Sequence, residues 1–358
     1  MNPSRLPIAL IPNKTWRGYA GGRELDRFRG IWPGADDNCP EAWVGSVTPV
    51  NRPLPDKPNL GLAEAQFDGK VVLVRDLMAQ YAGDLLGPAH LAAYGPHPQI
   101  LVKLLDAEKQ LGLQCHPTRA FAKANYGINY GKTESWYVVA LREDCPERPY
   151  VLLGFRDGIT REDFARGYYA GDVRAMEACL HKFYVQPGEM YFVDGGAPHA
   201  IGPGVLVVEV QEPSDITIGW RRQPCDDPAE QPHRDNLLLD TYVYDGGTEE
   251  EILRRWRIEP QDLARTEGGS EVLLLGRAQT PYFAITRVNV TGAFTPADTG
   301  RLRIAIVTGG KGVLRVGGEA FPTARGDEWL LPATCGPIAY EATEGELEVV
   351  LSHPPEVY

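Results

Sequence analysis

Four residues whose side chains can bind a metal ion occur in three short motifs of this sequence. Gln114 and His116 are one residue apart in an apolar, strand-like stretch, and side chains alternate along a strand, so both are expected on one face. Lys132 and Glu134 are likewise two apart in G-K-T-E, and His199 follows a glycine-rich turn in G-G-A-P-H-A-I. One amide oxygen, two imidazoles and one carboxylate suit Zn²⁺, Mn²⁺ or Fe²⁺ and leave a position open for substrate or water.

This ligand set is compatible with more than one class of protein. Two histidines and one carboxylate also form the facial triad of non-haem Fe(II) oxygenases, although the extra ligand Gln114 and the lysine Lys132 fit that class less well. A third hypothesis is a sugar-binding or structural β protein in which the metal only stiffens the fold. The other five histidines, at 90, 97, 181, 233 and 353, are expected in helices, loops or the tail and free of metal.

Composition limits the partners and the compartment. The chain has 358 residues with a formal charge of 36 − 48 = −12, which disfavours non-specific binding to nucleic acid or an anionic membrane. No apolar run approaches the roughly 18 residues of a membrane span. Six cysteines without a C-x-x-C pair indicate reduced thiols. We therefore expect a soluble, cytoplasmic protein whose partner is a small molecule; the sequence does not indicate its oligomeric state.

The elements that must position the motifs are mostly short strands. The 39 glycines and 30 prolines favour many turns, and β-rich runs such as SWYVVAL (135–141) and VLVVEV (205–210) alternate with predicted helices over 76–94, 160–183 and 249–257. Residues 100–116 have the pattern of a hairpin, and the polar segment 223–236 that of a surface loop. From about 258 onward strands follow one another, with Gly309-Gly310, Gly317-Gly318 and Gly326-Asp327 as predicted turns.

This pattern predicts a mainly β chain divided into two domains. Residues 1–257 would form a metal-binding domain with the helical insertions, and residues 258–358 a β-barrel without metal ligands. The segments 187–201 and 325–340 share a G-[ED]-x-[YW]-x-[VL] opening and a proline-marked turn, which indicates that the two domains are related repeats.

Five longer segments resemble the type I mannose-6-phosphate isomerase family in its shorter bacterial form. They are KTWRGYAGG (14–22), PEAWVGS (40–46), LVKLLDAEKQLGLQCHP (101–117), GKTESWYVVA (131–140) and GEMYFVDGGAPHAIGPGVLVVEVQEPSD (188–215). The resemblance implies two cupin-like β-barrels of the jelly-roll type with helical insertions. It also implies an enzyme that interconverts mannose 6-phosphate and fructose 6-phosphate through a cis-enediol intermediate.

The resemblance also implies roles for individual residues. It implies one zinc ion per chain, held by the four candidate ligands Gln114, His116, Glu134 and His199. Lys132 matches a lysine implicated in substrate contact. Glu209 matches a carboxylate that lines the pocket, and we nominate it as the base that moves the proton.

Two positions depart from the family pattern. Gly112 stands where the family usually has a serine associated with the substrate phosphate, and Gly219 where it usually has an arginine important for turnover. The adjacent Arg221 and Arg222 could supply the missing positive charge. Alternatively, the protein acts on another sugar or sugar phosphate, or binds sugar without catalysis.

Overall fold

The structure is a computed structural model that describes residues 2–51 and 53–357. It is mainly β, with 36% of residues in strands and 20% in helices, as the sequence predicts. Its contacts group Met1–Asp106, Val208–Val210 and Glu259–Tyr358 as a first unit and Ala107–Val207 with Gln211–Ile258 as a second. The predicted division into domains 1–257 and 258–358 stays a prediction.

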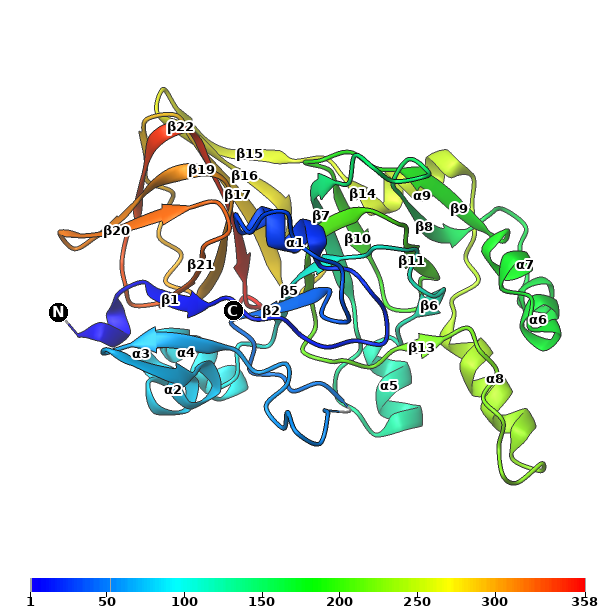
Figure 1. Ribbon diagram of the computed structural model, residues 1–358. Helices are drawn as coiled ribbons and strands as arrows, with labels where there is room; N and C mark the ends of the chain where they lie inside the picture. The colour runs from blue at the N-terminus through cyan, green and yellow to red at the C-terminus, as the bar shows by residue number, and fades with distance from the viewer. Residues whose placement is uncertain (1, 52, 358) are drawn as a thin grey trace. The chain divides into compact units, whose positions relative to one another are not determined.

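The first unit holds one large antiparallel sheet in the order β15-β16-β17-β22-β19-β21-β1-β3-β4, with β18 on β22 and β20 on β19 (Figure 1). These strands are β1 (Ile8–Ile11), β3 (Glu64–Phe67), β4 (Lys70–Leu73), β15 (Gln261–Thr266), β16 (Gly269–Leu275), β17 (Ala284–Val290), β18 (Ala293–Phe294), β19 (Arg303–Val316), β20 (Glu319–Ala324), β21 (Glu328–Leu331) and β22 (Ala339–His353). The unit also contains paired β2 (Glu41–Val44) and β5 (Leu101–Asp106), a 3-10 turn (Pro3–Arg5), and helices α1 (Arg23–Phe28), α2 (Val74–Gln80), α3 (Ala82–Leu86) and α4 (Pro88–Tyr94).

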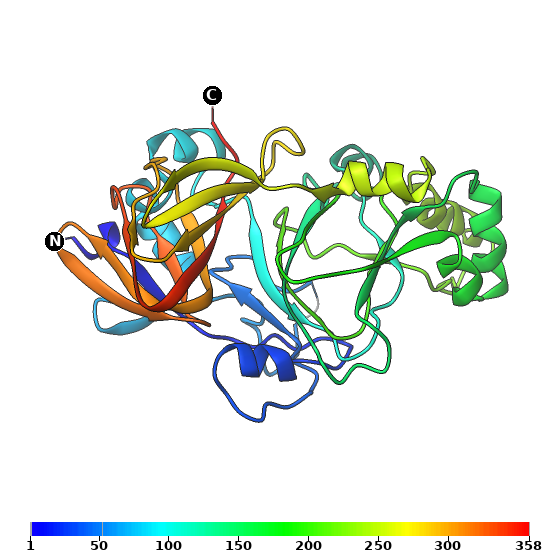
Figure 2. The same ribbon diagram turned by 90° about the horizontal axis from the view of Figure 1, so that it is seen from above.

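The second unit holds a sheet in the order β13-β6-β11-β8-β9 and the antiparallel pairs β10–β7 and β10–β14 (Figure 2). Its strands are β6 (Gln114–Cys115), β7 (Glu134–Leu141), β8 (Tyr150–Phe155), β9 (Leu180–Tyr184), β10 (Met190–Val193), β11 (His199–Ile201), β13 (Ile218–Gly219) and β14 (Arg257–Ile258). Its helices are α5 (Arg119–Tyr126), α6 (Arg161–Ala170), α7 (Val173–Glu177), α8 (Gln231–Thr241) and α9 (Glu249–Trp256). Strand β12 (Val205–Gln211) contributes residues to both units.

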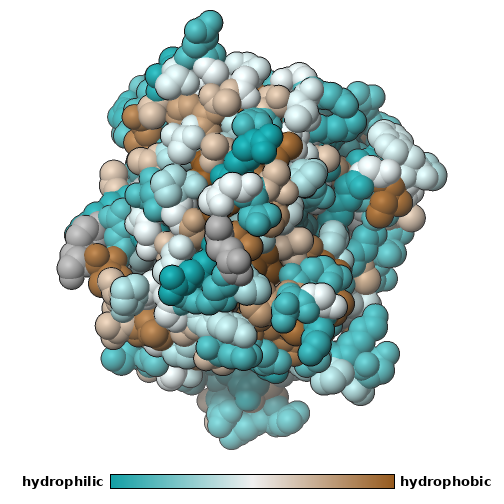
Figure 3. Space-filling model, turned by 90° about the vertical axis from the view of Figure 1, so that its left-hand side faces the viewer, coloured by the Kyte–Doolittle hydropathy of each residue, from teal (hydrophilic) through white to brown (hydrophobic). Residues whose placement is uncertain are grey.

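The sheets curve as a jelly-roll fold requires, but their hydrogen-bonded ladders run as open paths and do not close into barrels. Alternate strand residues of the first unit bury a core that includes Val307, Leu314 and Tyr340. Side chains on the outside are mainly polar: on the face shown in Figure 3, hydrophilic residues predominate and apolar ones occur in small groups.

The predicted helices form, with different ends. Thr160 and Thr248 each make the predicted capping box, with Asp163 and Glu251 respectively. The helix predicted over 160–183 stops at Gly171, whose left-handed backbone caps α6, and residues 180–184 form β9 instead. The segment predicted as one helix over 76–94 consists of three short ones, α2 to α4.

Three local predictions are wrong. Residues 100–116 are not a hairpin, because β6 pairs with β11 and β13 while β5 pairs with β2. Part of the loop predicted at 223–236 is helical, since α8 begins at Gln231 with a proline in its first turn. Gly309-Gly310 is not a turn between strands: β19 continues through it with register shifts, as a β-bulge does.

Candidate metal centre

Glycines bring the three sequence motifs into contact. The backbone N–H of Gly196 donates to the carbonyl oxygen of His116 at 2.7 Å, which ties the turn before His199 to the strand end after Gln114. Gly196 has φ +92°, and a Cβ there would lie 2.4 Å from Val243 Cγ2. Such positions exclude other residues, so the glycine-rich turn is a condition for assembling the site.

The candidate ligands stand at the starts of short strands in the second unit. Glu134 is the first residue of β7 and His199 the first of β11. Gln114 is the first of β6 and the register partner of His199, and His116 follows directly after β6. The pairing of β6 with β11 therefore places the candidate ligands of residues 112–116 next to His199.

His116, Glu134 and His199 form a compact buried cluster. Their ligand atoms all lie within 4.8 Å of one another, and each residue is at most 1% exposed. Glu134 Oε2 lies 3.2 Å from His116 Nε2, and Glu134 Oε1 lies 3.4 Å from His199 Nε2. Across residues 2–51 and 53–357, this is the one group of three or more histidine, cysteine or acidic side chains close enough to share a metal ion.

Backbone carbonyls fix the protonation of both imidazoles. His116 Nδ1 lies 2.9 Å from the carbonyl oxygen of Ile216, and His199 Nδ1 lies 2.9 Å from that of Ala197. A carbonyl oxygen only accepts, so each Nδ1 carries the proton and each Nε2 presents a lone pair toward Glu134. Metal-binding histidines in proteins are held by outer hydrogen bonds of this kind.

Two observations show that a cation fits the cluster. The buried Nε2 of His199 has no hydrogen-bond partner in the described part of the chain. The ammonium of Lys132 lies 2.7 Å from both His116 Nε2 and Glu134 Oε2. Imidazole lone pairs and a carboxylate that already attract an ammonium form a donor set for a divalent metal ion.

The electrostatics agree with this assignment. Burial, reinforced by the charge of Lys132, lowers the pKa of His116 to about 3, and burial also lowers the pKa of His199. Burial alone would raise the pKa of Glu134, but the charge of Lys132 holds it well below its usual range. The cluster therefore presents neutral imidazoles and an ionised carboxylate, the forms that bind a metal.

Trp136 supports the cluster from β7. Its Nε1–H donates to Glu134 Oε1 at 3.1 Å, and its ring meets that of His199 edge-on at 5.4 Å between centroids. An indole donor orients the carboxylate without adding charge. Trp136 thus contributes to the site.

Gln114, the fourth predicted ligand, is only partly buried. Its backbone is the register partner of His199, which is consistent with the alternation argument, but its place in a metal shell stays a prediction.

A tryptophan occupies the space beside Gly112. A Cβ at Gly112 would lie 3.5 Å from Trp220 Nε1, and the guanidinium of Arg221 stacks over the Trp220 ring at 5.1 Å from its centroid. Gly219, the other departure from the family pattern, is the register partner of Gln114. Arg221 is therefore connected through Trp220 to the segment that carries Gln114 and His116.

Arg222 has a structural partner. Its guanidinium donates to Asp235 at distances of 2.8 to 3.2 Å, and the Tyr168 hydroxyl donates to the same carboxylate at 2.8 Å. Asp235 is 2% exposed and lies on α8. Arg222 thus anchors α8, and its predicted contact with substrate stays untested.

Glu209 belongs to a separate buried cluster within the first unit. Its carboxylate lies 3.7 Å from the Nζ of Lys103, which also lies 3.9 Å from Glu41 and 5.0 Å from the centroid of the Trp43 ring. Burial alone would raise the pKa of Glu41, but the charges of Lys103 and Arg17 lower it to about 2.

Sequence reasoning missed Lys103. The signal was a lysine inside the apolar run ILVKLLD, where a charge is retained only with partners. It is 2% exposed, and every residue of β5 is buried.

Comparison with known proteins identifies relatives of this architecture. Residues 277–354 match the family model for the cupin domain of mannose-6-phosphate isomerase. The mannose-6-phosphate isomerase of Streptococcus mutans is 29% identical over 256 residues, which cover 71% of this chain and 73% of that protein. The mannose-6-phosphate isomerase ManA of Bacillus subtilis is 26% identical over 254 residues, covering 71% and 74% respectively.

Solved structures share the fold. The crystal structure of the mannose 6-phosphate isomerase from Bacillus subtilis superposes with a TM-score of 0.73 at 20% sequence identity. The superposition covers 97% of this chain and 99% of that one, so the shared fold extends over almost all of both chains.

Proposed function

Because the chain belongs to the type I mannose-6-phosphate isomerase family, we propose that it is a metal-dependent isomerase that interconverts mannose 6-phosphate and fructose 6-phosphate. The observation that carries the proposal is the buried cluster of His116, Glu134 and His199, with both imidazoles oriented by backbone carbonyls. Burying two Nε2 lone pairs against a carboxylate is costly unless a cation compensates them, so the cluster favours a bound metal ion.

We assign the resident metal as zinc. His116, Glu134 and His199 would hold it, with Gln114 as the fourth ligand, and nitrogen and oxygen donors of this kind are common in catalytic zinc sites. When bound, the metal would act as a Lewis acid that stabilises negative charge developing on a substrate oxygen. Six free cysteines are consistent with action in the cytoplasm, and across the described ranges the structure contains no helix long and apolar enough to cross a membrane.

Lys132 is proposed to contact the sugar. The residue is 4% exposed and its ammonium lies against the carboxylate of Glu134, so it places a positive charge beside the metal ligands. That charge would favour the enediolate oxygen over the neutral sugar, because the interaction strengthens as negative charge develops.

Glu209 is proposed to move the proton between C1 and C2. Its carboxylate, 3.7 Å from the Nζ of Lys103, would accept the proton from one carbon and return it to the neighbouring carbon. Replacing it with glutamine is expected to lower kcat by at least a hundredfold while the metal content stays unchanged, since proton transfer typically contributes about 10² to 10⁴. Glu319→Gln, on the exposed strand β20, is the matched control.

We propose that Arg221 binds the phosphate. It is exposed, and it stacks on the tryptophan that lies beside Gly112, where the family serine would stand. A second candidate function follows from the same observation: a large ring beside Gly112 changes the shape of this region, which favours a related sugar phosphate as substrate.

Metal analysis combined with an isomerase assay tests the proposal. The purified full-length protein should contain one zinc per chain by mass spectrometry, convert mannose 6-phosphate to fructose 6-phosphate, lose activity with a chelator and regain it with zinc. His199→Ala should lose metal and activity together, whereas His233→Ala, at an exposed position on α8, should lose neither.

Two results would contradict the proposal. A His199→Ala protein with full activity would overturn the metal assignment. A protein that holds zinc but converts none of the hexose 6-phosphates would overturn the isomerase assignment.

A further inference from the structure

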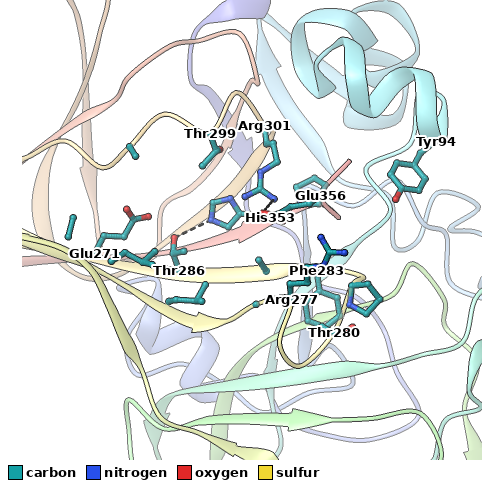
Figure 4. Close-up of a pocket in the computed structure, with 18 residues that line it drawn as sticks. Tyr94, Glu271, Arg277, Thr280, Phe283, Thr286, Thr299, Arg301, His353 and Glu356 are labelled. Atoms are coloured by element: carbon teal, nitrogen blue, oxygen red, sulfur yellow. Dashed lines mark hydrogen bonds and ion pairs between the residues drawn. The ribbon is translucent and has the colours of Figure 1, made fainter. Parts of the chain in front are cut away.

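A cavity lined by polar, charged and apolar side chains lies in the first unit, on the inner side of β16, β17 and β22 (Figure 4). Its volume is about 670 Å³, within the range of small-molecule sites. All its lining residues belong to the first unit, whereas the candidate metal ligands belong to the second. Tyr94 and Leu263, both partly exposed, also line it, so small molecules can reach it from solvent.

Three polar side chains form a hydrogen-bonded chain along one wall. Thr286 Oγ1 lies 3.1 Å from His353 Nε2 (Figure 4). The Thr286 hydroxyl also donates to the carboxylate of Glu271, which works against the rise in the pKa of Glu271 that burial causes. A hydroxyl has one proton to donate, and its donation to the carboxylate leaves Oγ1 to accept from His353 Nε2–H. The other imidazole nitrogen, Nδ1, is then a bare acceptor.

That acceptor is buried and unsatisfied. His353 is 2% exposed, and its Nδ1 has no hydrogen-bond partner within residues 2–51 and 53–357. Burial, with the charges of Arg301 and Arg303, holds the pKa of His353 well below its usual range, so the ring stays neutral. An unsatisfied buried acceptor costs about 1–3 kcal/mol, which a bound molecule with a hydroxyl group would recover.

Charged side chains of both signs line the cavity. Arg277 and Arg301 line it, as do Glu271 and Glu356, so the charges of the lining balance. Arg301 lies 3.3 Å from Glu356. An acid group would therefore be held by its position beside the two guanidinium groups, which are strong hydrogen-bond donors to carboxylates, and not by a net charge of the cavity.

The remaining walls are apolar. Figure 4 shows Phe283 beside Arg277, with His353 and Arg301 grouped together. Leu273 and Ala284 continue the apolar surface. A ligand must therefore present a hydrocarbon surface as well as polar groups.

We propose that this cavity binds an organic acid that carries a hydroxyl group on an apolar or aromatic body. The hydroxyl donates to His353 Nδ1, the acid group interacts with Arg277 and Arg301, and the body packs on Phe283. The site shares no residue with the proposed isomerase site.

Three related probes test this ligand class by calorimetry on the full-length, metal-loaded protein: 4-hydroxycinnamate, cinnamate, and 4-hydroxycinnamamide. The first should bind. Cinnamate, without the hydroxyl, and the amide, without the charge, should each bind about tenfold more weakly, because each loses one interaction with a buried or charged group. Absence of binding by all three at millimolar concentration would overturn the proposal.

Variants locate the binding. Ala297→Trp places a large ring at an exposed lining position and should abolish binding of 4-hydroxycinnamate, whereas Ala320→Trp, exposed on β20, should leave it unchanged. His353→Phe should remove the difference between 4-hydroxycinnamate and cinnamate. Metal content and a thermal melt check that each variant is folded.

Equal binding by wild type and Ala297→Trp would place the probe elsewhere and overturn the proposal. So would retention of the hydroxyl preference in His353→Phe. Neither result depends on isomerase activity. This proposal can therefore fail while the proposed function stands, and the proposed function can fail while this proposal stands.

Discussion

Two buried groups of histidine and glutamate in this chain have the same residue types but different partners. In the second unit, His116 and His199 donate through Nδ1 to backbone carbonyls and direct Nε2 at the ionised Glu134. In the first unit, His353 is hydrogen-bonded through Nε2 to a threonine and stands among arginines. The first arrangement attracts a cation, and the second attracts a hydroxyl group and an anion. The groups that surround each imidazole, more than the imidazole itself, therefore decide which ligand fits.

The largest expected effect separates the two glutamates. Glu134→Gln should lose bound metal and lower kcat/KM by about a thousandfold or more, because the only anionic ligand of the cluster is removed. Glu271→Gln should keep both metal and isomerase activity. Metal analysis and the coupled isomerase assay measure both variants. Loss of metal from Glu271→Gln would contradict the proposal that only the group of Glu134 binds the metal.

A smaller loss should follow when the cation beside the metal ligands is removed. Lys132→Met keeps the apolar stem but removes the ammonium, so kcat/KM should fall about a hundredfold, as for other groups that stabilise transition-state charge. The metal should be retained, since all four proposed ligands remain. Loss of metal from Lys132→Met would instead assign the lysine to assembly of the site.

The two adjacent arginines should differ in kind. Arg221→Met should raise KM for the sugar phosphate about tenfold without changing stability, as expected for an exposed phosphate contact. Arg222→Met should leave KM unchanged and lower the free energy of unfolding, since buried Asp235 loses its charged partner. Kinetics and urea denaturation of both proteins measure this, and the opposite pattern would exchange the two assignments.

His353 should also give the first unit a pH-dependent stability. Its pKa in the folded protein is lowered, so below about pH 6.5 the unfolded chain binds a proton that the folded chain does not. Stability should then fall by up to about 1.4 kcal/mol per pH unit as the pH drops below that value. Denaturant unfolding at pH 7.5 and pH 5.5 should show a smaller fall for His353→Phe than for wild type. Equal falls would mean that His353 is protonated in the folded state.

Sequence patterns predicted the metal cluster better than the cavity. Alternation along strands selected His116 and Glu134, the glycine-rich turn selected His199, and the structure brings the three together. The sequence placed His353 in a tail after the last strand. In the structure, β22 is one strand of 15 residues that ends at this histidine.

What the sequence could not predict depends on pairing between distant segments. The residues of the cavity wall come from β16, β17 and β22, and only the register of Ala284 with His353 brings them together. Strand β6 was predicted to pair with its neighbour in sequence, but its partners are β11 and β13. Local patterns specify which face a side chain takes, not which strand lies beside it.

The smallest expected effect restores a family feature. A Cβ at Gly219 meets no atom of the described residues within 4 Å, so Gly219→Arg should be tolerated and leave the free energy of unfolding within about 0.5 kcal/mol. If Arg221 already supplies the phosphate contact, the added arginine should change kcat/KM less than about threefold in wild type but restore most of the loss in Arg221→Met. A large gain in wild type would mean that Arg221 does not replace the family arginine. The rescue experiment thus distinguishes a rearranged phosphate site from a different substrate, because only a rearranged site accepts either arginine.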